Sequence, residues 1–149
     1  MSRPTAVVHP LAPWLRARVL ALRAATRARN FPGLVELVPG GATATSAPTA
    51  GWTYGAERTD HALRVDVLVR LMTDCGLRGV RRVSLVHVRG GRHEPTDSDL
   101  GWAAAAGVAA AISGVELATA LSLSRWGWRD LASGEECSWV RPRARAGAA

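Results

Sequence analysis

Residues 80–124 read VRRVSLVHVRGGRHEPTDSDLGWAAAAGVAAAISGVELATALSLS, and this stretch decides the fold class. Two arginines stand near its start, and the residues after them form an apolar, β-branched run. This run predicts a core strand over 80–88. The glycine pair at 90–91 must end that strand. A second apolar run at 115–124 predicts another strand. The stretch therefore predicts a strand, a turn, a helix and a strand in succession.

The helix expected between these strands has its own start and stop signals. Thr96 lies three positions before Asp99, an arrangement close to a capping box. We expect the helix to run to Ser113 and to end at Gly114. Its surface is built from alanine rather than from large apolar residues, which is typical of a buried helix and not of a membrane span.

A further helix is predicted upstream, over residues 60–75. Asp60 is a suitable N-cap and Gly76 a suitable stop. The apolar residues within 65–71 also alternate with the period of a strand. We favour the helix.

The N-terminal third is the basic part of the chain. Pro13 can begin a helix that ends near Asn30. Its apolar face consists of Leu15, Val19 and Leu22, and its basic face of Arg16, Arg23 and Arg27. Residues 34–38 follow as a short strand that places Glu36 among apolar neighbours, where a buried acid needs a partner. Residues 40–53 have the composition of a loop.

The chain has 149 residues and 48% hydrophobic residues, enough for one domain with a real core. These elements predict a single α/β domain with a mixed sheet flanked by helices. We expect a basic N-terminal helix over 1–33, the α/β domain over 34–140 and a basic, disordered tail over 141–149.

Composition gives a weaker indication of partners. The net charge is +7, but all basic residues are arginine, so part of this charge reflects a biased residue composition rather than an anionic partner.

Cys75 and Cys137 are too sparse for a disulfide scaffold and lack zinc-knuckle spacing. No secretory signal is recognisable, because prolines interrupt the N-terminus, and we expect a cytoplasmic location.

The junction between the predicted strand and helix is the best candidate for a site. His87, His93, Asp97 and Asp99 could converge there on zinc, since imidazole and carboxylate are zinc ligands. The alternative is structural: a histidine at a strand end is often hydrogen-bonded, and aspartates before a helix are often caps. We therefore expect no cofactor, with zinc as the alternative.

The same junction resembles a known family. His87 at a strand end, a glycine-rich loop, and Pro95-Thr96 followed by Asp99 and a helix resemble the core of the JAB/MPN metallopeptidase-like fold, especially its RadC-like branch. The resemblance covers roughly residues 58–135. It implies a site in which two histidines and an aspartate bind zinc and an upstream glutamate acts as general base.

This sequence departs from that pattern at the ligands themselves. His87 and Asp99 match, but Arg89 stands at the second histidine, Gly90 at the following proline and Thr96 at the serine. An arginine cannot be deprotonated to bind a metal. We expect Arg89 to pair with Asp99 instead, which makes the chain a catalytically inactive member of this fold. The alternative is a zinc-dependent, isopeptidase-like hydrolase in which a residue such as His93 replaces the missing ligand.

The candidates for the general base are Glu36 and Glu57, and neither can be aligned with the family's glutamate.

Nucleic-acid binding is a separate hypothesis. The segment Arg125-Trp126-Gly127-Trp128-Arg129 falls at the tip of a hairpin whose second strand is expected over 128–131, after a tight turn at Trp126-Gly127. Arginine neutralises phosphate and tryptophan offers a stacking face, and the basic face of the first helix and Trp139 add to both. At least one of Trp126 and Trp128 should instead pack in the core, because they alternate along a strand.

The third hypothesis is a protein-interaction role. Domains of the JAB/MPN type without the metal motif commonly serve as scaffolds, as the resemblance implies. The smooth alanine helix could pack against a second copy of the chain as well as against its own sheet, so a homodimer is a possible assembly.

Overall fold

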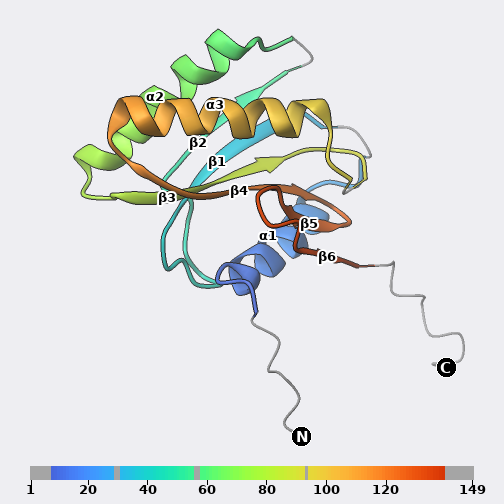
Figure 1. Cartoon of the computed structure of the whole chain (residues 1–149). Helices are drawn as coiled ribbons and strands as arrows, with labels where there is room; N and C mark the ends of the chain where they lie inside the picture. The colour runs from blue at the N-terminus through green and yellow to red at the C-terminus, as the bar shows by residue number, and fades with distance from the viewer. Residues whose placement is uncertain (1–7, 29–30, 56–57, 93, 140–149) are drawn as a thin grey trace, which may run out of the picture.

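Six strands form one mixed sheet in the order β2-β1-β3-β4-β5-β6 (Figure 1). The computed structural model describes residues 8–28, 31–55, 58–92 and 94–139. The helices are α1 (Ala12–Ala25), α2 (His61–Leu77) and α3 (Asp97–Ser113). The strands are β1 (Gly33–Pro39), β2 (Ala50–Tyr54), β3 (Arg82–Val88), β4 (Glu116–Ser124), β5 (Gly127–Asp130) and β6 (Glu136–Ser138). The predicted α/β class with a mixed sheet flanked by helices is confirmed.

β3 and β4 are the parallel pair of this sheet, and the other neighbouring strands run antiparallel. Helix α3 connects them, as parallel strands require a crossover. Val88 lies opposite Leu123, so both strands finish at the same end of the sheet. The loops that follow them, which begin at Arg89 and Arg125, are therefore neighbours.

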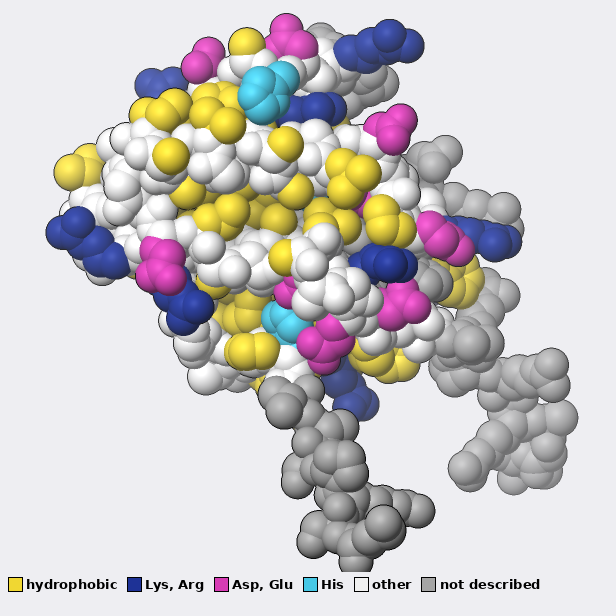
Figure 2. Space-filling model, in the orientation of Figure 1, with side chains coloured by type: hydrophobic (Ala, Val, Ile, Leu, Met, Phe, Trp, Pro, Cys, Tyr) yellow, Lys and Arg dark blue, Asp and Glu magenta, His cyan; other side chains and the backbone are white. Residues whose placement is uncertain are grey.

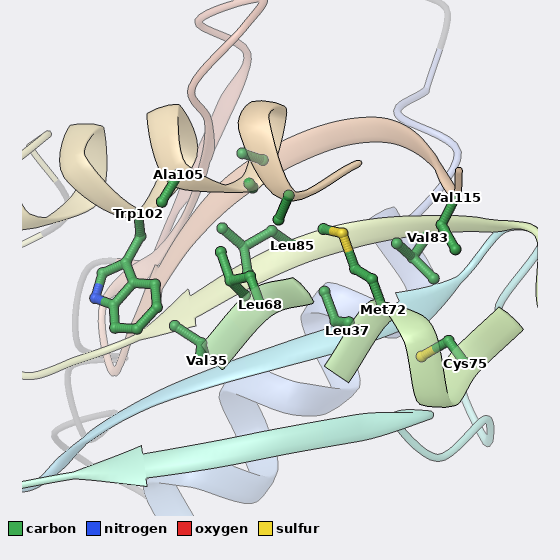
Figure 3. Packing of buried hydrophobic residues seen from close by; sticks show 13 residues of the cluster. Val35, Leu37, Leu68, Met72, Cys75, Val83, Leu85, Trp102, Ala105 and Val115 are labelled. Carbon is green, nitrogen blue, oxygen red and sulfur yellow. The ribbon is translucent and has the colours of Figure 1, made fainter. Parts of the chain in front are cut away.

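Helices α2 and α3 cover one face of the sheet and α1 covers the other (Figure 1). On the α2–α3 face, Trp102, Leu68 and Met72 are fully buried against β1 and β3 (Figure 3). Alanines at 105, 106 and 109 turn toward the sheet and allow α3 to approach closely. One side of the alanine-rich helix α3 is thus buried against the sheet of its own chain.

Helix α1 packs on the opposite face rather than projecting from the domain. Trp14, Leu15 and Val19 are buried there, as the predicted apolar face requires. Arg18 donates from Nε and Nη2 to the carboxylate of Glu36, with the shortest contact at 2.6 Å. Glu36, the buried acid on β1, therefore has a charged partner, as expected from the sequence.

The predicted helix signals near α2 and α3 are confirmed. Asp60 accepts a hydrogen bond from the backbone N–H of Leu63. Thr96 and Asp99 form a complete capping box, and Gly114 ends α3 in the left-handed conformation with φ 73°. The alternating residues at 65–71 belong to a helix, as favoured.

Several predicted boundaries differ from the structure. The first helix ends at Ala25, not near Asn30, because its apolar face is complete at Leu22; Asn30 itself lies outside the described residues. Helix α2 continues through Gly76 to Leu77, since Gly79, with φ +84°, makes the left-handed turn.

Two strand predictions also need correction. Residues 50–53 were expected in a loop but belong to β2, because pairing with β1 outweighs their low strand propensity. The turn between β4 and β5 lies at Arg125 and Trp126, one position earlier than expected, and β6 was not predicted. The expected tail at 141–149 lies outside the described residues.

Within the described residues, no helix is both long and apolar enough to cross a membrane. The outer surface of α2 and α3 nevertheless carries scattered apolar side chains (Figure 2). Its exposed members are Leu63, Leu77, Leu100, Val108 and Ile112.

Candidate functional site

The predicted site lies where β3 ends and α3 begins. His87 is the penultimate residue of β3, Arg89 follows the strand, and Asp99 lies in the first turn of α3. The crossover brings all three together: His87 Nδ1 lies 2.6 Å from Asp99 Oδ1, and Arg89 Nη2 lies 2.7 Å from Asp99 Oδ2. His87 is 1% exposed and Asp99 0% exposed, so the group is shielded from water. The predicted pairing of Arg89 with Asp99 is confirmed.

Asp99 serves the helix and the site at once. Its backbone N–H donates to Thr96 Oγ1, and its carboxylate accepts from the Thr96 backbone N–H at 2.9 Å. Burial alone would raise the pKa of Asp99, but the hydrogen bonds from His87, Arg89 and Thr96 outweigh it and hold that pKa far below its usual range. The carboxylate is therefore ionised and can only accept, so the capping box fixes an anion beside the strand.

Arg89 uses its whole guanidinium group within the chain. Nε and Nη2 each donate to the carboxylate of Asp99, which makes a bidentate pair. The remaining hydrogens are donated to the backbone carbonyls of Gly90, Arg92 and Glu94. A guanidinium has five N–H donors, and each of them has an acceptor here. The loop after β3 is thus folded around this cation.

His87 is held by a second partner that the sequence reasoning missed. Because ionised Asp99 can only accept, Nδ1 of His87 donates to it, and Nε2 of His87 forms a hydrogen bond of 2.5 Å with the hydroxyl group of Tyr54. Tyr54 ends β2, the strand that was expected to be a loop. Its ring lies directly over Gly33, where any Cβ would clash with it. The alternation of Trp52 and Tyr54 was the available signal.

Aromatic side chains from β2 and α3 surround His87. Tyr54 stacks on His87 with ring centroids 5.9 Å apart, and Trp102 lies 5.7 Å from Tyr54. The guanidinium of Arg64 stands over the Trp102 ring at 5.6 Å. Trp102 Nε1 and Ser122 Oγ are buried there without an acceptor or donor among the described residues. His87 is therefore buried among aromatic rings, with polar atoms of Trp102 and Ser122 close by.

These residues do not fit a zinc centre of the kind that the resemblance implies. Both Asp99 oxygens and both His87 nitrogens are already hydrogen-bonded, and the Arg89 cation stands against the carboxylate. No group of three or more potential ligands occurs in the described part of the chain. Asp97 is exposed in the first turn of α3, and His93 lies outside the described residues.

Glu36 lies away from this site. It shares the α1 face of the sheet with Val86 and is paired with Arg18, whereas His87 faces α3. It therefore cannot serve as a base next to His87. Glu57 lies outside the described residues.

The second set of predicted residues forms a surface at the same end of the sheet. Arg23 donates from Nε to the backbone carbonyl of Arg125 at 2.6 Å and from Nη2 to that of Trp139. Arg125 donates from Nη1 to the carbonyl of Arg27, and the Trp139 N–H donates to the carbonyl of Trp126. We call these five residues the Arg–Trp surface. Segments more than a hundred positions apart are joined in it by hydrogen bonds.

The other predicted contact residues lie elsewhere. Trp128 is 4% exposed and packs against α1 and His9, so it is not available to stack on a ligand. This agrees with the expectation that one of the two hairpin tryptophans packs in the core. Arg129 is paired with Glu136 at 3.2 Å across β5 and β6. Arg16 is exposed on α1.

Comparison of the chain with known proteins gives no further guide. No protein-family model, no curated protein and no solved structure matches it.

Proposed function

We propose that this chain is a non-catalytic, JAB/MPN-like binding module in which an arginine has replaced the metal. The observation that carries the proposal is the Arg89 guanidinium, which donates all its hydrogens to Asp99 and to the carbonyls of its own loop. A zinc ion brings positive charge to a histidine–aspartate pair, and here a fixed side-chain cation supplies that charge. It offers neither a Lewis acid nor a bound water.

The consequence is a site that stabilises the end of the sheet without supplying a nucleophile. Asp99 caps α3, Arg89 holds the loop after β3, and Tyr54 ties β2 to His87. His87 and Asp99, which match the family pattern, thus have structural roles in this proposal. Function then lies in what the loops at this end of the sheet bind, either a nucleic acid or a protein partner.

The test is the metal content of protein purified without chelator, measured by elemental mass spectrometry beside an Asp99→Ala variant. We expect no stoichiometric zinc in either protein. About one zinc per chain in the wild type, lost in Asp99→Ala, would overturn the proposal and restore the zinc-dependent hydrolase. Metal-dependent cleavage of an isopeptide substrate would do the same.

Self-association is a second candidate role, favoured by the outer face of α3. Leu100, Val108 and Ile112 remain exposed there, and no charged residue lies between Asp99 and the end of the helix. An uncharged face on a two-helix layer suits packing against a second copy. Light scattering over a range of protein concentrations tests it, and a strict monomer throughout would exclude the homodimer.

A further inference from the structure

We infer that the Arg–Trp surface binds single-stranded nucleic acid, with phosphates held by Arg27 and Arg125 and a base stacked on Trp126. The inference names the partner of the proposed binding module and rests on that proposal. It is carried by three features of the surface: arginines that have no carboxylate partner among the described residues, an exposed indole and a fixed backbone beneath them.

Arg125 is the first feature. Within the described residues its guanidinium makes one hydrogen bond, from Nη1 to the Arg27 carbonyl. Its Nη2 group has no acceptor among the described residues, and neither has its Nε, which is shielded from solvent. The guanidinium of Arg125 thus keeps donors for a ligand at Nη2, unlike that of Arg89, whose five hydrogens all have acceptors within the chain. A phosphate presents several acceptor oxygens in a geometry that matches this planar group.

The local charge also favours an anion. The side chains of Arg23 and Arg125 donate to backbone carbonyls, whereas Arg27 contributes only its own carbonyl, as an acceptor; none of the three has a carboxylate partner in the described part of the chain. Arg129 on the adjoining strand, by contrast, is paired with Glu136. The positive charge of the Arg–Trp surface is therefore not neutralised by neighbouring side chains.

Trp126 is the second feature. It is 40% exposed, and no other tryptophan, tyrosine or phenylalanine among the described residues is exposed. Its neighbour Trp128 points into the core, so Trp126 is not needed to fill that space. A ring open to solvent beside two arginines can stack on an unpaired base. Bases in a duplex are stacked on one another, which favours a single strand.

The third feature is the rigidity of the backbone that carries these groups. Arg23 is a positioning residue: it holds both the β4–β5 turn and the chain at Trp139 through their carbonyls. The Trp126 N–H donates to Ser124 Oγ, and the Trp126 carbonyl accepts from Trp139. The backbone that carries Arg125 and Trp126 is thus set in place before a ligand arrives, which lowers the entropic cost of binding.

The test is fluorescence anisotropy of the full chain with a short labelled oligothymidylate, titrated at several salt concentrations. Two phosphate contacts predict a slope of about −1.4 in log K against log salt, and Trp126→Ala should weaken binding about tenfold or more. Arg125→Ala should weaken binding more than its matched control Arg70→Ala. Arg70 is an exposed arginine on α2, across the sheet from α1.

Equal effects of Arg125→Ala and Arg70→Ala, affinity independent of salt, or a duplex bound as tightly as the single strand would overturn the inference. Absence of binding at low salt would also overturn the inference, and a protein would then remain as the partner of the binding module. Circular dichroism confirms that each variant is folded, and oligouridylate in the same assay separates RNA from DNA. The metal measurement does not depend on any of these results, so failure of this inference and failure of the proposed function are distinguishable.

Discussion

Arg89→Ala removes the cation from a carboxylate that stays buried. Two hydrogen bonds to the Asp99 carboxylate are lost, each worth about 1.5–3 kcal/mol when one partner is charged. The carbonyls of Arg92 and Glu94 lie in exposed residues and regain water, so their loss adds little. Breaking a buried pair by removing one partner costs about 3–5 kcal/mol. We expect a loss of that size in the free energy of unfolding.

Urea unfolding followed by tryptophan fluorescence measures this loss. In thermal unfolding the same loss lowers Tm by about 6–20 °C, since 1 kcal/mol shifts a chain of this size by about 2–4 °C. Arg129→Ala is the control, because its pair with Glu136 is partly exposed and contributes no more than about 1 kcal/mol. If Arg89→Ala destabilises the chain no more than Arg129→Ala, the idea that this cation organises the end of the sheet is refuted.

Three further predictions follow from the same contacts. Arg89→His supplies the ligand type that the family pattern has at this position. Together with His87 and Asp99 the new histidine should bind zinc, and elemental mass spectrometry should find about one zinc per chain. A variant that is folded and metal-free would argue against the resemblance. Because the folded-state pKa of Asp99 is lowered, its contribution to stability is present above pH about 4 and is lost as pH falls further. Asp99→Asn should therefore be less stable than the wild type at neutral pH and show a flatter decline below pH about 4, and parallel curves would contradict the assignment. Arg18→Ala should cost about 3 kcal/mol in urea unfolding because it leaves Glu36 buried without its cation, whereas Arg18→Ala with Glu36→Gln should recover most of that loss.

Local signals were enough to predict the helices around the site. The capping box of Thr96 and Asp99 and the left-handed stop at Gly114 depend on residues within one turn, and both are present. The start of α2 at Asp60 is likewise a local property. β2 was missed because its signal is not local: Ala50 and Gly51 have low strand propensity and become a strand through pairing with β1.

The same division explains the site. Arg89 and Asp99 could be paired from the sequence because a strand end and the following helix start are joined by a short loop. Tyr54 could not be added, because its contact with His87 needs β1 to lie between β2 and β3 and needs Gly33 to leave room for the ring. The hydrogen bonds of Arg23 are similar, since they join α1 to a turn 102 positions away and to Trp139.

The two surfaces share a cause in the topology. β3 and β4 are parallel, so Arg89 and Arg125 follow strand ends that lie side by side, and the Arg89 N–H donates to the carbonyl of Leu123. Each arginine is placed by the same architectural feature, yet one is fully satisfied inside the chain and the other has donors left over. A buried cation that holds the loop rigid and an unsatisfied one beside it suit a protein that binds an anion at this end of the sheet. A zinc-dependent hydrolase that uses His87 and Asp99 as ligands would need the reverse, with these side chains free and the Arg89 cation at a distance.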